Sequence, residues 1–485
     1  MHQARIKITF FYLLSALFIL LNTYFLVMKH SMIINALPFV FAIALLAVFA
    51  LDKLLHLVIF FTPLSLPLSE LVHGLPINMF LPTEPLLFGI LLIFILKCTA
   101  IKGFDRDILK HPVSLAIYFS LTWMFVTSLT STMPVVSLKF FLSRIWFVVG
   151  FYLLAAKLFE EQKNIEKYVW LYVFSLIIVI FYSTYRHLGY GLWDKQAAHF
   201  VMDPFYNDHT AYGAAIAMYL PFLFGFSFTK LYGKHTRIFV RICLSIVFMA
   251  LILSYARAAW LSMMAALGVW IIMRLKIKFK HLLATFLVSL TLIFAFQHQI
   301  VTYLERNTTE SSANLMDHFS SMSNISSDAS NLERLNRWSC AIRMFEDKPI
   351  FGYGPGTYMF QYAPYQLTSD RTIISTNSAN GGNAHSEYLG PLAESGLLGA
   401  ISVLILIITV IYTGIHAYSR TDDKKLKTLA IGALLGLITY YIHGTMNNFL
   451  DTDKLSVPFW GFSAIIVAID IYTKKKISPK NSSDF

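Results

Sequence analysis

Long apolar stretches separated by short polar segments run through most of the chain. A helix that crosses a membrane needs about 20 apolar residues, because each residue adds about 1.5 Å against about 30 Å of hydrocarbon. The pattern therefore predicts about fourteen transmembrane helices. Their centres lie near residues 18, 42, 60, 91, 121, 146, 177, 218, 246, 266, 289, 406, 436 and 465. The third, from Leu54 to Leu71, contains Pro63 and Pro67, so we expect it to be kinked or only partly inserted.

The predicted fold is an all-α polytopic membrane protein in three parts. Residues 1–298 are expected to form the first eleven helices, and residues 396–485 the last three helices and a basic tail. Residues 299–395 form one large loop between them. The composition agrees with this class, because 56% of the residues are hydrophobic and only 14% are charged.

Lysine and arginine gather in alternate short loops and in the Lys474–Lys476 tail, whereas the intervening short loops contain few. The positive-inside rule places cation-rich loops in the cytoplasm. Both termini are then cytoplasmic, and the large loop lies on the outer face of the membrane. The net charge of +12 therefore reflects cations beside an anionic leaflet, so the expected partner is the lipid bilayer and not nucleic acid.

The large loop contains one predicted helix. A capping-box sequence, Ser330 to Glu333, opens it, and Pro349 prevents it from continuing beyond Asp347. Apolar residues recur along it at spacings of three and four, which predicts a helix that lies flat on the outer membrane surface. These residues are Leu335, Trp338, Ile342 and Phe345.

Two arginines of this helix differ in their position relative to the apolar stripe. Arg334 falls beside the stripe, at the level where a lipid-linked phosphate would emerge, and Arg337 points further away. Arg334 could instead contact the phosphate of ordinary lipids. The helical wheel alone leaves both interpretations open.

Three other outer segments contain candidate chemistry. Arg257 lies among small residues between two spans, where it either approaches a ligand or extends its charge to the interface. His385 marks the return into the membrane, where a neutral imidazole could accept a proton near pH 7 or could simply cap the helix. The Gly352–Gly356 segment lacks the Gly-Lys-Ser/Thr ending of a P-loop, so it predicts a turn whose backbone N–H groups could touch an anion.

Taken together, these segments resemble the O-antigen ligase and polymerase superfamily of bacterial membrane glycosyltransferases. The matching motifs occupy the second half of the chain, in the order that the family shows. They are Ser254–Trp260, Arg334–Trp338 with Asp347–Gly356, and Ala384–Leu389 with Leu392–Gly399.

The resemblance implies a helical fold of the GT-C-like type in the bacterial inner membrane, with the active site on the periplasmic side. It implies the inverting transfer of a glycan from an undecaprenyl diphosphate carrier to an acceptor hydroxyl, without a metal or another cofactor. Arg257 and Arg334 would hold the diphosphate, with Arg337 as the competing choice for the second ligand, and His385 would activate or orient the acceptor. Further residues would contact the acceptor or shape the loop: Gly354, Gly356, Glu387, Glu394, Asp208 and His209.

The acceptor stays open at this stage. A lipid A-core sugar would make the protein a ligase, another carrier-linked repeat would make it a chain polymerase, and a protein acceptor is a third option. The Asp203–Tyr212 segment looks closer to exopolysaccharide-type members of the superfamily. A transporter or flippase of lipid-linked sugars is the alternative from another class, and it is kept open by Lys139 and Arg144 within the sixth predicted span.

Two Asp-x-Asp strings could be taken for metal-binding motifs. They are Asp105-Arg106-Asp107 and Asp451-Thr452-Asp453. Such short patterns arise often by chance, and we expect both to be solvated loop charges.

Overall fold

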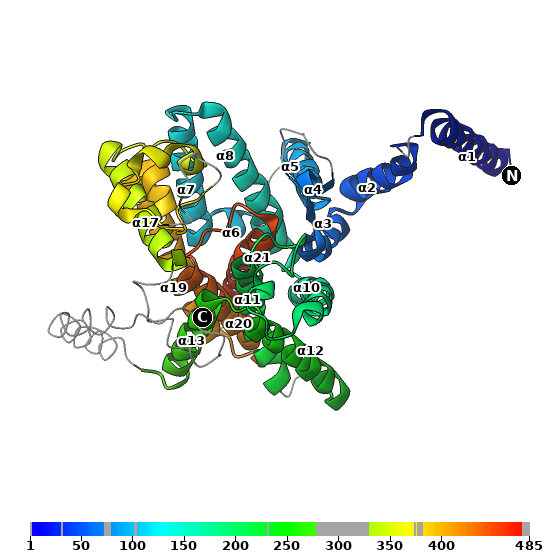
Figure 1. Ribbon diagram of the computed structural model, residues 1–485. Coiled ribbons are helices and arrows are strands. Elements are labelled where there is room, and N and C mark those ends of the chain that lie inside the picture. The colour runs from blue at the N-terminus through cyan, green and yellow to red at the C-terminus, as the bar shows by residue number, and fades with distance from the viewer. Residues whose placement is uncertain are drawn as a thin grey trace. The chain divides into compact units, whose positions relative to one another are not determined.

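The computed structural model describes residues 2–30, 33–71, 79–100, 104–229, 232–277, 329–372, 375 and 382–477. Almost all regular structure in these residues is helical (Figure 1). Ten of the described helices are long and apolar enough to cross a membrane. The predicted all-α polytopic class is thereby confirmed, whereas the total of about fourteen spans stays a prediction.

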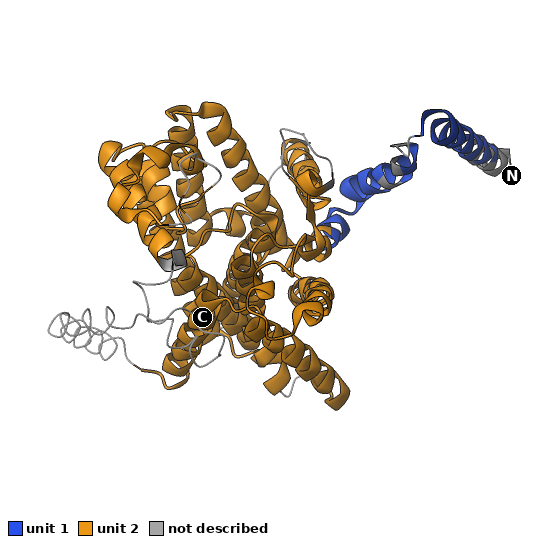
Figure 2. Ribbon diagram, viewed as in Figure 1, with its two compact units in different colours: residues 1–57 blue, residues 58–485 orange. Residues whose placement is uncertain are grey.

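The chain separates into two compact units, residues 1–57 and residues 58–485 (Figure 2). The first unit contains α1 (His2–Lys29), a 3-10 turn at Ile33–Ala36, α2 (Leu37–Phe49) and the beginning of α3 (Leu51–Phe61). Within it, Tyr12–Lys29 is long and apolar enough to span a membrane.

The second unit contains the remaining helices. Nine of the ten candidate spans belong to it, and they coincide with predicted centres. These spans comprise α7 (Pro112–Leu129), α8 (Pro134–Val148) continued by a π-helical segment (Val149–Leu154) and α9 (Ala155–Leu158), α10 (Lys163–Tyr190), α11 (His209–Phe228), α12 (Lys234–Leu253), α13 (Arg257–Arg274), α19 (Leu389–Arg420), α20 (Lys424–His443) and α21 (Asp453–Ile477).

Shorter elements connect or flank these spans. They are a 3-10 turn at Thr62–Leu64, β1 (Leu66–Pro67), α4 (Leu68–Leu71), β2 (Phe80–Leu81), α5 (Thr83–Ala100), α6 (Arg106–Leu109), a 3-10 turn at Ala197–His199, α17 (Ala329–Asp347), α18 (Tyr358–Gln361), and 3-10 turns at Ala363–Tyr365 and Thr368–Asp370. The predicted span near residue 91 corresponds to the 18-residue helix α5. The span predicted near residue 289 lies outside the described residues.

The third predicted span is not a continuous helix. α3 ends at Phe61, and the chain then forms a 3-10 turn and a short strand, in which Leu66 and Pro67 pair with Leu81 and Phe80 of β2. Pro63 and Pro67 lack the N–H groups that a continuing helix would need. The expectation of an interruption in this segment was therefore right.

Helices α11, α20 and α21 are the most buried of the candidate spans. α20 packs closely on α11 because two glycines, four residues apart, face it. A Cβ on Gly436 would lie 2.5 Å from the Met218 carbonyl oxygen, and a Cβ on Gly432 would lie 2.7 Å from the Phe222 ring. Small residues on one helix face allow two backbones to approach in this way.

The prediction that Asp453 is a solvated loop charge is wrong. Asp453 is fully buried at the start of α21, beside the almost fully buried Lys454. The ammonium group of Lys454 donates to the carbonyl oxygens of Thr62 at 2.9 Å and Ser65 at 2.7 Å, and the Asp453 carboxylate accepts from the hydroxyl groups of Ser65 and Thr83. These bonds join the β1–β2 segment to α21, nearly 400 residues later, so no local sequence pattern could reveal them.

Replacing Asp453 by alanine should therefore lower the free energy of unfolding by about 3–5 kcal/mol, because it leaves the Lys454 charge buried without its carboxylate. Lys425→Ala is the matched control, because Lys425 pairs with Glu166 at 3.1 Å in a partly exposed position. It should cost about 1 kcal/mol or less. Thermal unfolding of the purified protein measures both, and equal effects would contradict the structural role of Asp453.

Candidate functional site

The predicted site residues lie at one end of the helical bundle, which we call the loop end. Here the N-terminal ends of α11, α13, α19 and α21 meet the C-terminal end of α20. The Glu387 N–H, just before α19, donates to the carbonyl oxygen of Gly444 after α20 at 2.8 Å. A Cβ on Gly213 of α11 would lie 2.5 Å from Ala256 before α13, so these two ends also touch.

The extramembrane helix α17 ends at Asp347 as predicted, but its N-terminal detail differs. It begins at Ala329, so Ser330 lies inside the helix. Glu333 pairs with Arg337 and accepts hydrogen bonds from Thr372 and Ser375. These two partners belong to a later segment, so Glu333 fixes tertiary structure here.

The apolar stripe of α17 is only part of its apolar surface. Leu335 and Ile342 are 39% and 44% exposed. The opposite face is buried in a core that the wheel did not reveal, because tyrosine and alanine partners from later segments complete it. That core comprises Cys340, Ala341, Met344, Tyr353, Tyr358, Tyr362, Ala384 and Ala393. The placement of the exposed stripe on a membrane surface stays a prediction.

Arg334 extends from α17 to the turn after α20. Its Nε donates to the carbonyl oxygen of Met446 at 3.3 Å, and its side chain is partly exposed. Its charge also contributes to the low pKa of His385, so the two side chains lie close together. The structure thus brings two predicted site residues, 51 positions apart in the chain, to one place.

Arg337 has a different environment. Its Nε donates to Glu333 Oε1 at 2.6 Å, and its guanidinium group lies over the Tyr362 ring with 3.9 Å to the ring centroid. The residue is only 5% exposed. A Cβ on Gly382 would collide with the guanidinium group, so that glycine leaves room for it. Arg337 therefore belongs to the packing of the large loop.

His385 is held in a rare backbone conformation. Its φ of 48° lies in the left-handed region, which disfavours residues other than glycine and asparagine. Its N–H donates to Asn383 Oδ1 at 3.0 Å, and its carbonyl oxygen accepts from Trp338 Nε1 at 3.4 Å. Burial and the nearby guanidinium groups of Arg334 and Arg337 lower the pKa of His385 to about 4. The imidazole is therefore neutral at pH 7 and can accept a proton.

Asp208 and His209 lie at the beginning of α11. Asp208 caps this helix by accepting from the Thr210 N–H at 2.9 Å, and it pairs with His209 Nδ1 at 2.9 Å. His209 stacks on His199 with 4.2 Å between ring centroids. Burial raises the pKa of Asp208, but the hydrogen bonds from His209 and Thr210 outweigh it and hold this pKa below its usual range. Asp208 is therefore an anion at neutral pH.

The Asp208–His209 pair connects the Arg257 region with the His385 region. Burial, His209 and other cations including Arg257 lower the pKa of His199 to about 4, and the charge of Asp208 acts on His385. Arg257 begins α13 two residues after Tyr255, whose φ of 50° is also left-handed. Backbone strain of this kind is typical of functional sites. Two of the three motif segments thus contain a strained residue beside a candidate ligand.

The turn after α20, residues 444–450, was not singled out from the sequence. Glu387 holds it, because one carboxylate oxygen accepts from the N–H groups of Phe449 at 2.8 Å and Leu450 at 3.0 Å. Asn447 Nδ2 lies 3.2 Å from Nε2 of the buried His443, whose Nδ1 has no partner. Since Arg334 is anchored to the same turn, Glu387 and Asn447 both help to fix its guanidinium group.

The glycine-rich turn packs closely against other parts of the chain. Gly354 has a φ of 112°, and a Cβ there would lie 1.9 Å from the Ser131 hydroxyl oxygen. Its N–H donates to the Glu394 carbonyl oxygen at 2.8 Å, and Glu394 Oε1 accepts from the Tyr358 N–H at 2.9 Å. A Cβ on Gly356 would lie 2.9 Å from the Phe140 ring. The turn therefore joins α19 to the α7–α8 connection.

Gly354→Ala is accordingly expected to lower the melting temperature strongly, because alanine combines an unfavourable φ with a collision at Ser131. Gly268→Ala is the matched control, since a Cβ there meets nothing within 4 Å and the residue lies inside α13. That control should keep or slightly raise stability. Similar melting temperatures for the two variants would contradict the assigned role of Gly354.

Comparison with known proteins supports the motifs. Residues 242–404 match the family model of O-antigen ligase, and this segment includes Arg257, Arg334 and His385. Over 247 residues the chain is 24% identical to an uncharacterized protein of Haemophilus influenzae, an alignment that covers 48% of this chain and 55% of that protein. The match thus spans about half the length of that relative. Residues 242–404 of this chain are thus similar to the O-antigen ligase family, which supports the superfamily that its motifs predicted.

Proposed function

We propose that this protein is an O-antigen ligase- or polymerase-type glycosyltransferase. It would move a glycan from an undecaprenyl diphosphate carrier to an acceptor hydroxyl at the periplasmic face of the bacterial inner membrane. The observation that carries this proposal is the placement of three segments at the loop end of a helical bundle that is apolar enough to span a membrane. Arg334 contacts the turn after α20, Trp338 of the same helix contacts the His385 carbonyl oxygen, and Ala256, next to Arg257, contacts α11.

The chemistry fits these side chains. When the anomeric carbon–oxygen bond to the carrier breaks, negative charge grows on the diphosphate. Arginine keeps its proton and offers planar N–H pairs that suit phosphate oxygens. The N-terminus of α13 would also stabilise the negative charge of the diphosphate, because a helix N-terminus favours anions and the Ala256 side chain has no group to cap it. His385 would take the acceptor hydroxyl proton as the new bond to the anomeric carbon forms.

The environment of the two α17 arginines favours Arg334 as the second phosphate ligand. Arg337 is engaged with Glu333 and Tyr362 inside the loop, whereas Arg334 is partly exposed and faces the His385 region. Moving Arg337 to a ligand would leave Glu333 buried without its cation, which is costly.

The transporter alternative has less support. Arg144, which kept that alternative open, donates to the carbonyl oxygen of Leu450 at the loop end. Lys139 is exposed at the side of α8. Neither cation has the environment of a substrate-coupled charge enclosed at the middle of a span. The topology of the proposal, with both termini in the cytoplasm, rests on the distribution of lysine and arginine.

The experiment that separates ligase from polymerase is a lipid analysis of a strain lacking this protein. Carrier-linked glycan should accumulate, and its length identifies the missing step. Complete chains on the carrier point to a ligase, and single repeat units point to a polymerase. The undisturbed formation of all surface glycans and glycoproteins, with no accumulation, would refute the proposed reaction.

Glycan transfer by the purified protein should also continue in the presence of a chelator. Two arginines can neutralise the diphosphate, so the proposed mechanism needs no divalent ion. The assay compares transfer rates with and without EDTA, using enzyme washed free of metal. A loss of activity that magnesium or manganese restores would contradict this part of the mechanism.

A further inference from the structure

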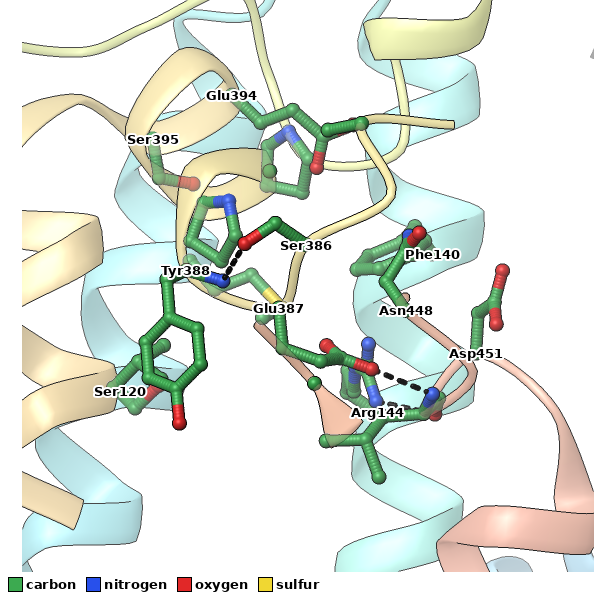
Figure 3. A pocket seen from close by; sticks show the side chains of 18 of the residues that line it. Ser120, Phe140, Arg144, Ser386, Glu387, Tyr388, Glu394, Ser395, Asn448 and Asp451 are labelled. Carbon is green, nitrogen blue, oxygen red and sulfur yellow. Dashed lines mark hydrogen bonds between the residues drawn. The ribbon is translucent and has the colours of Figure 1, made fainter. Parts of the chain in front are cut away.

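A cavity of about 210 Å³ lies among side chains that include Arg144, Ser386 and Glu387 (Figure 3). It is lined by residues of α7, α8, α19, α20 and α21, of the glycine-rich turn and of the turn after α20. Asn383, Ala384 and Ser386, which flank His385 in the sequence, contribute to its wall. The segment that contains the proposed base therefore also forms part of the cavity wall.

The cavity is large enough for a substituted six-membered ring. A cavity of about 150 Å³ in a protein core admits benzene, so the space found here can hold a ring and several hydroxyl groups. Its wall is rich in aromatic side chains, whose faces suit the C–H groups of a sugar. These aromatic residues are Phe140, Tyr358, Tyr388, Tyr440, Phe459 and Trp460.

The charges around the cavity disfavour an anionic occupant. Glu387, Glu394 and Asp451 contribute carboxyl groups, and Arg144 contributes the single guanidinium group of its wall. Arg144 is already engaged with the carbonyl oxygen of Leu450. A diphosphate is therefore better placed near Arg334, while carboxylates can accept hydrogen bonds from neutral hydroxyl groups.

The polar groups of this wall also suit a sugar. Glu387, Glu394 and Asp451 can accept hydrogen bonds, and Asn383, Ser386 and Asn448 bring amide and hydroxyl groups that donate and accept. Sugar hydroxyls, which donate and accept, match this combination, whereas a hydrocarbon chain offers these groups no hydrogen bond.

We infer that this cavity is a subsite for one neutral sugar ring of a glycan substrate. The inference rests on the proposed glycosyltransferase function and names where part of a substrate would sit. The ring could belong to the acceptor or to the carrier-linked glycan, because both present the same chemistry. Either would be held in part by the segment that contains the residue proposed to activate the acceptor.

Gly390 allows a direct test. It is buried in the cavity wall, and the nearest atom to a Cβ built there is the Ala384 Cβ at 3.9 Å. Gly390→Leu should fill part of the cavity, and Gly390→Ala, with a methyl group in ordinary contact, is the matched control. Both substitutions lie in the first turn of α19, where either side chain is a better helix former than glycine.

The binding measurement is saturation-transfer NMR on the full chain in lipid nanodiscs, with methyl glycosides of glucose, galactose and N-acetylglucosamine as probes. At least one neutral glycoside should receive saturation in the native protein and in Gly390→Ala, and the signal should fall about tenfold in Gly390→Leu. Equal signals in all three proteins, or no signal from any neutral glycoside, would overturn the inference. Matching melting temperatures of the two variants exclude a general loss of structure.

Transfer assays then identify the source of the ring. If the acceptor occupies the cavity, Gly390→Leu raises the KM for the acceptor and leaves the KM for the carrier-linked glycan unchanged. If a ring of the carrier-linked glycan occupies it, the KM for the carrier-linked glycan rises and the KM for the acceptor stays unchanged. Unchanged values for both would contradict the subsite. The NMR measurement needs no turnover, so it can detect sugar binding even in a protein that transfers no glycan. Binding without transfer would refute the proposed function and leave the subsite intact.

Discussion

Replacing Arg334 by alanine is expected to lower the rate of glycan transfer by about 100- to 1,000-fold, the usual cost of losing one preorganised group that stabilises developing negative charge. The melting temperature should change little, because the Arg334 side chain is partly exposed and its bond to the Met446 carbonyl oxygen is long, at 3.3 Å. Arg334→Lys should recover only a fraction of the rate, since an ammonium group cannot bind two phosphate oxygens as a planar fork.

Two other arginines of α17 provide the controls. Arg337→Ala should lower the free energy of unfolding by about 3–5 kcal/mol, because it leaves Glu333 buried without its cation. Arg343 pairs with Asp370 at 2.6 Å at a partly exposed position, so Arg343→Ala should affect neither rate nor stability strongly. Arg334 does not belong to the proposed site if the Arg334→Ala protein transfers glycan at a near-native rate. The same conclusion follows if this protein loses activity only because it unfolds.

Replacing His385 by asparagine is expected to reduce transfer by about 100- to 10,000-fold, the contribution usual for a general base. Asparagine is the informative choice because it tolerates the left-handed backbone conformation that His385 adopts at a φ of 48°. The substitution therefore removes the base without adding strain. His416→Asn, in the distant half of α19, is the matched control and should leave the rate unchanged.

The pH dependence provides an independent readout for His385. Burial and the neighbouring guanidinium groups lower its pKa to about 4, so the basic, neutral form persists well below pH 6.5. The kcat/KM of the native protein should consequently stay constant from neutral pH down to about pH 5. A bound diphosphate adds negative charge, which raises the pKa, so the acid limb of kcat should lie at higher pH. An acid limb of kcat/KM near pH 6.5 would contradict the described environment.

Much of the fold could be predicted from the sequence, because hydropathy alone indicates where the membrane-spanning helices lie. Ten predicted spans coincide with long apolar helices, and the end of α17 at Asp347 follows from Pro349. The interruption in the third predicted span followed from Pro63 and Pro67 for the same local reason. Each of these features is decided within one stretch of chain, where composition and proline dominate.

The proposal that Arg257, Arg334 and His385 form one site depended on the family resemblance, because no local pattern relates three segments so far apart. The helical wheel of α17 predicts which way each side chain points but not which residues it contacts. It therefore could not predict that Arg337 contacts Glu333 and Tyr362. The turn after α20 and the buried Asp453–Lys454 pair were missed for a similar reason. Their partners, including Glu387 and Ser65, come from other parts of the chain, and only tertiary structure brings them together.

A structure of the full protein with undecaprenyl diphosphate bound in a lipid nanodisc would test the central claim most directly. The two phosphates should lie within hydrogen-bonding distance of the guanidinium groups of Arg257 and Arg334, with the imidazole of His385 beside them. A carrier lipid whose phosphates bind at the opposite end of the helical bundle, or bind at the loop end without contacting these arginines, would contradict the account.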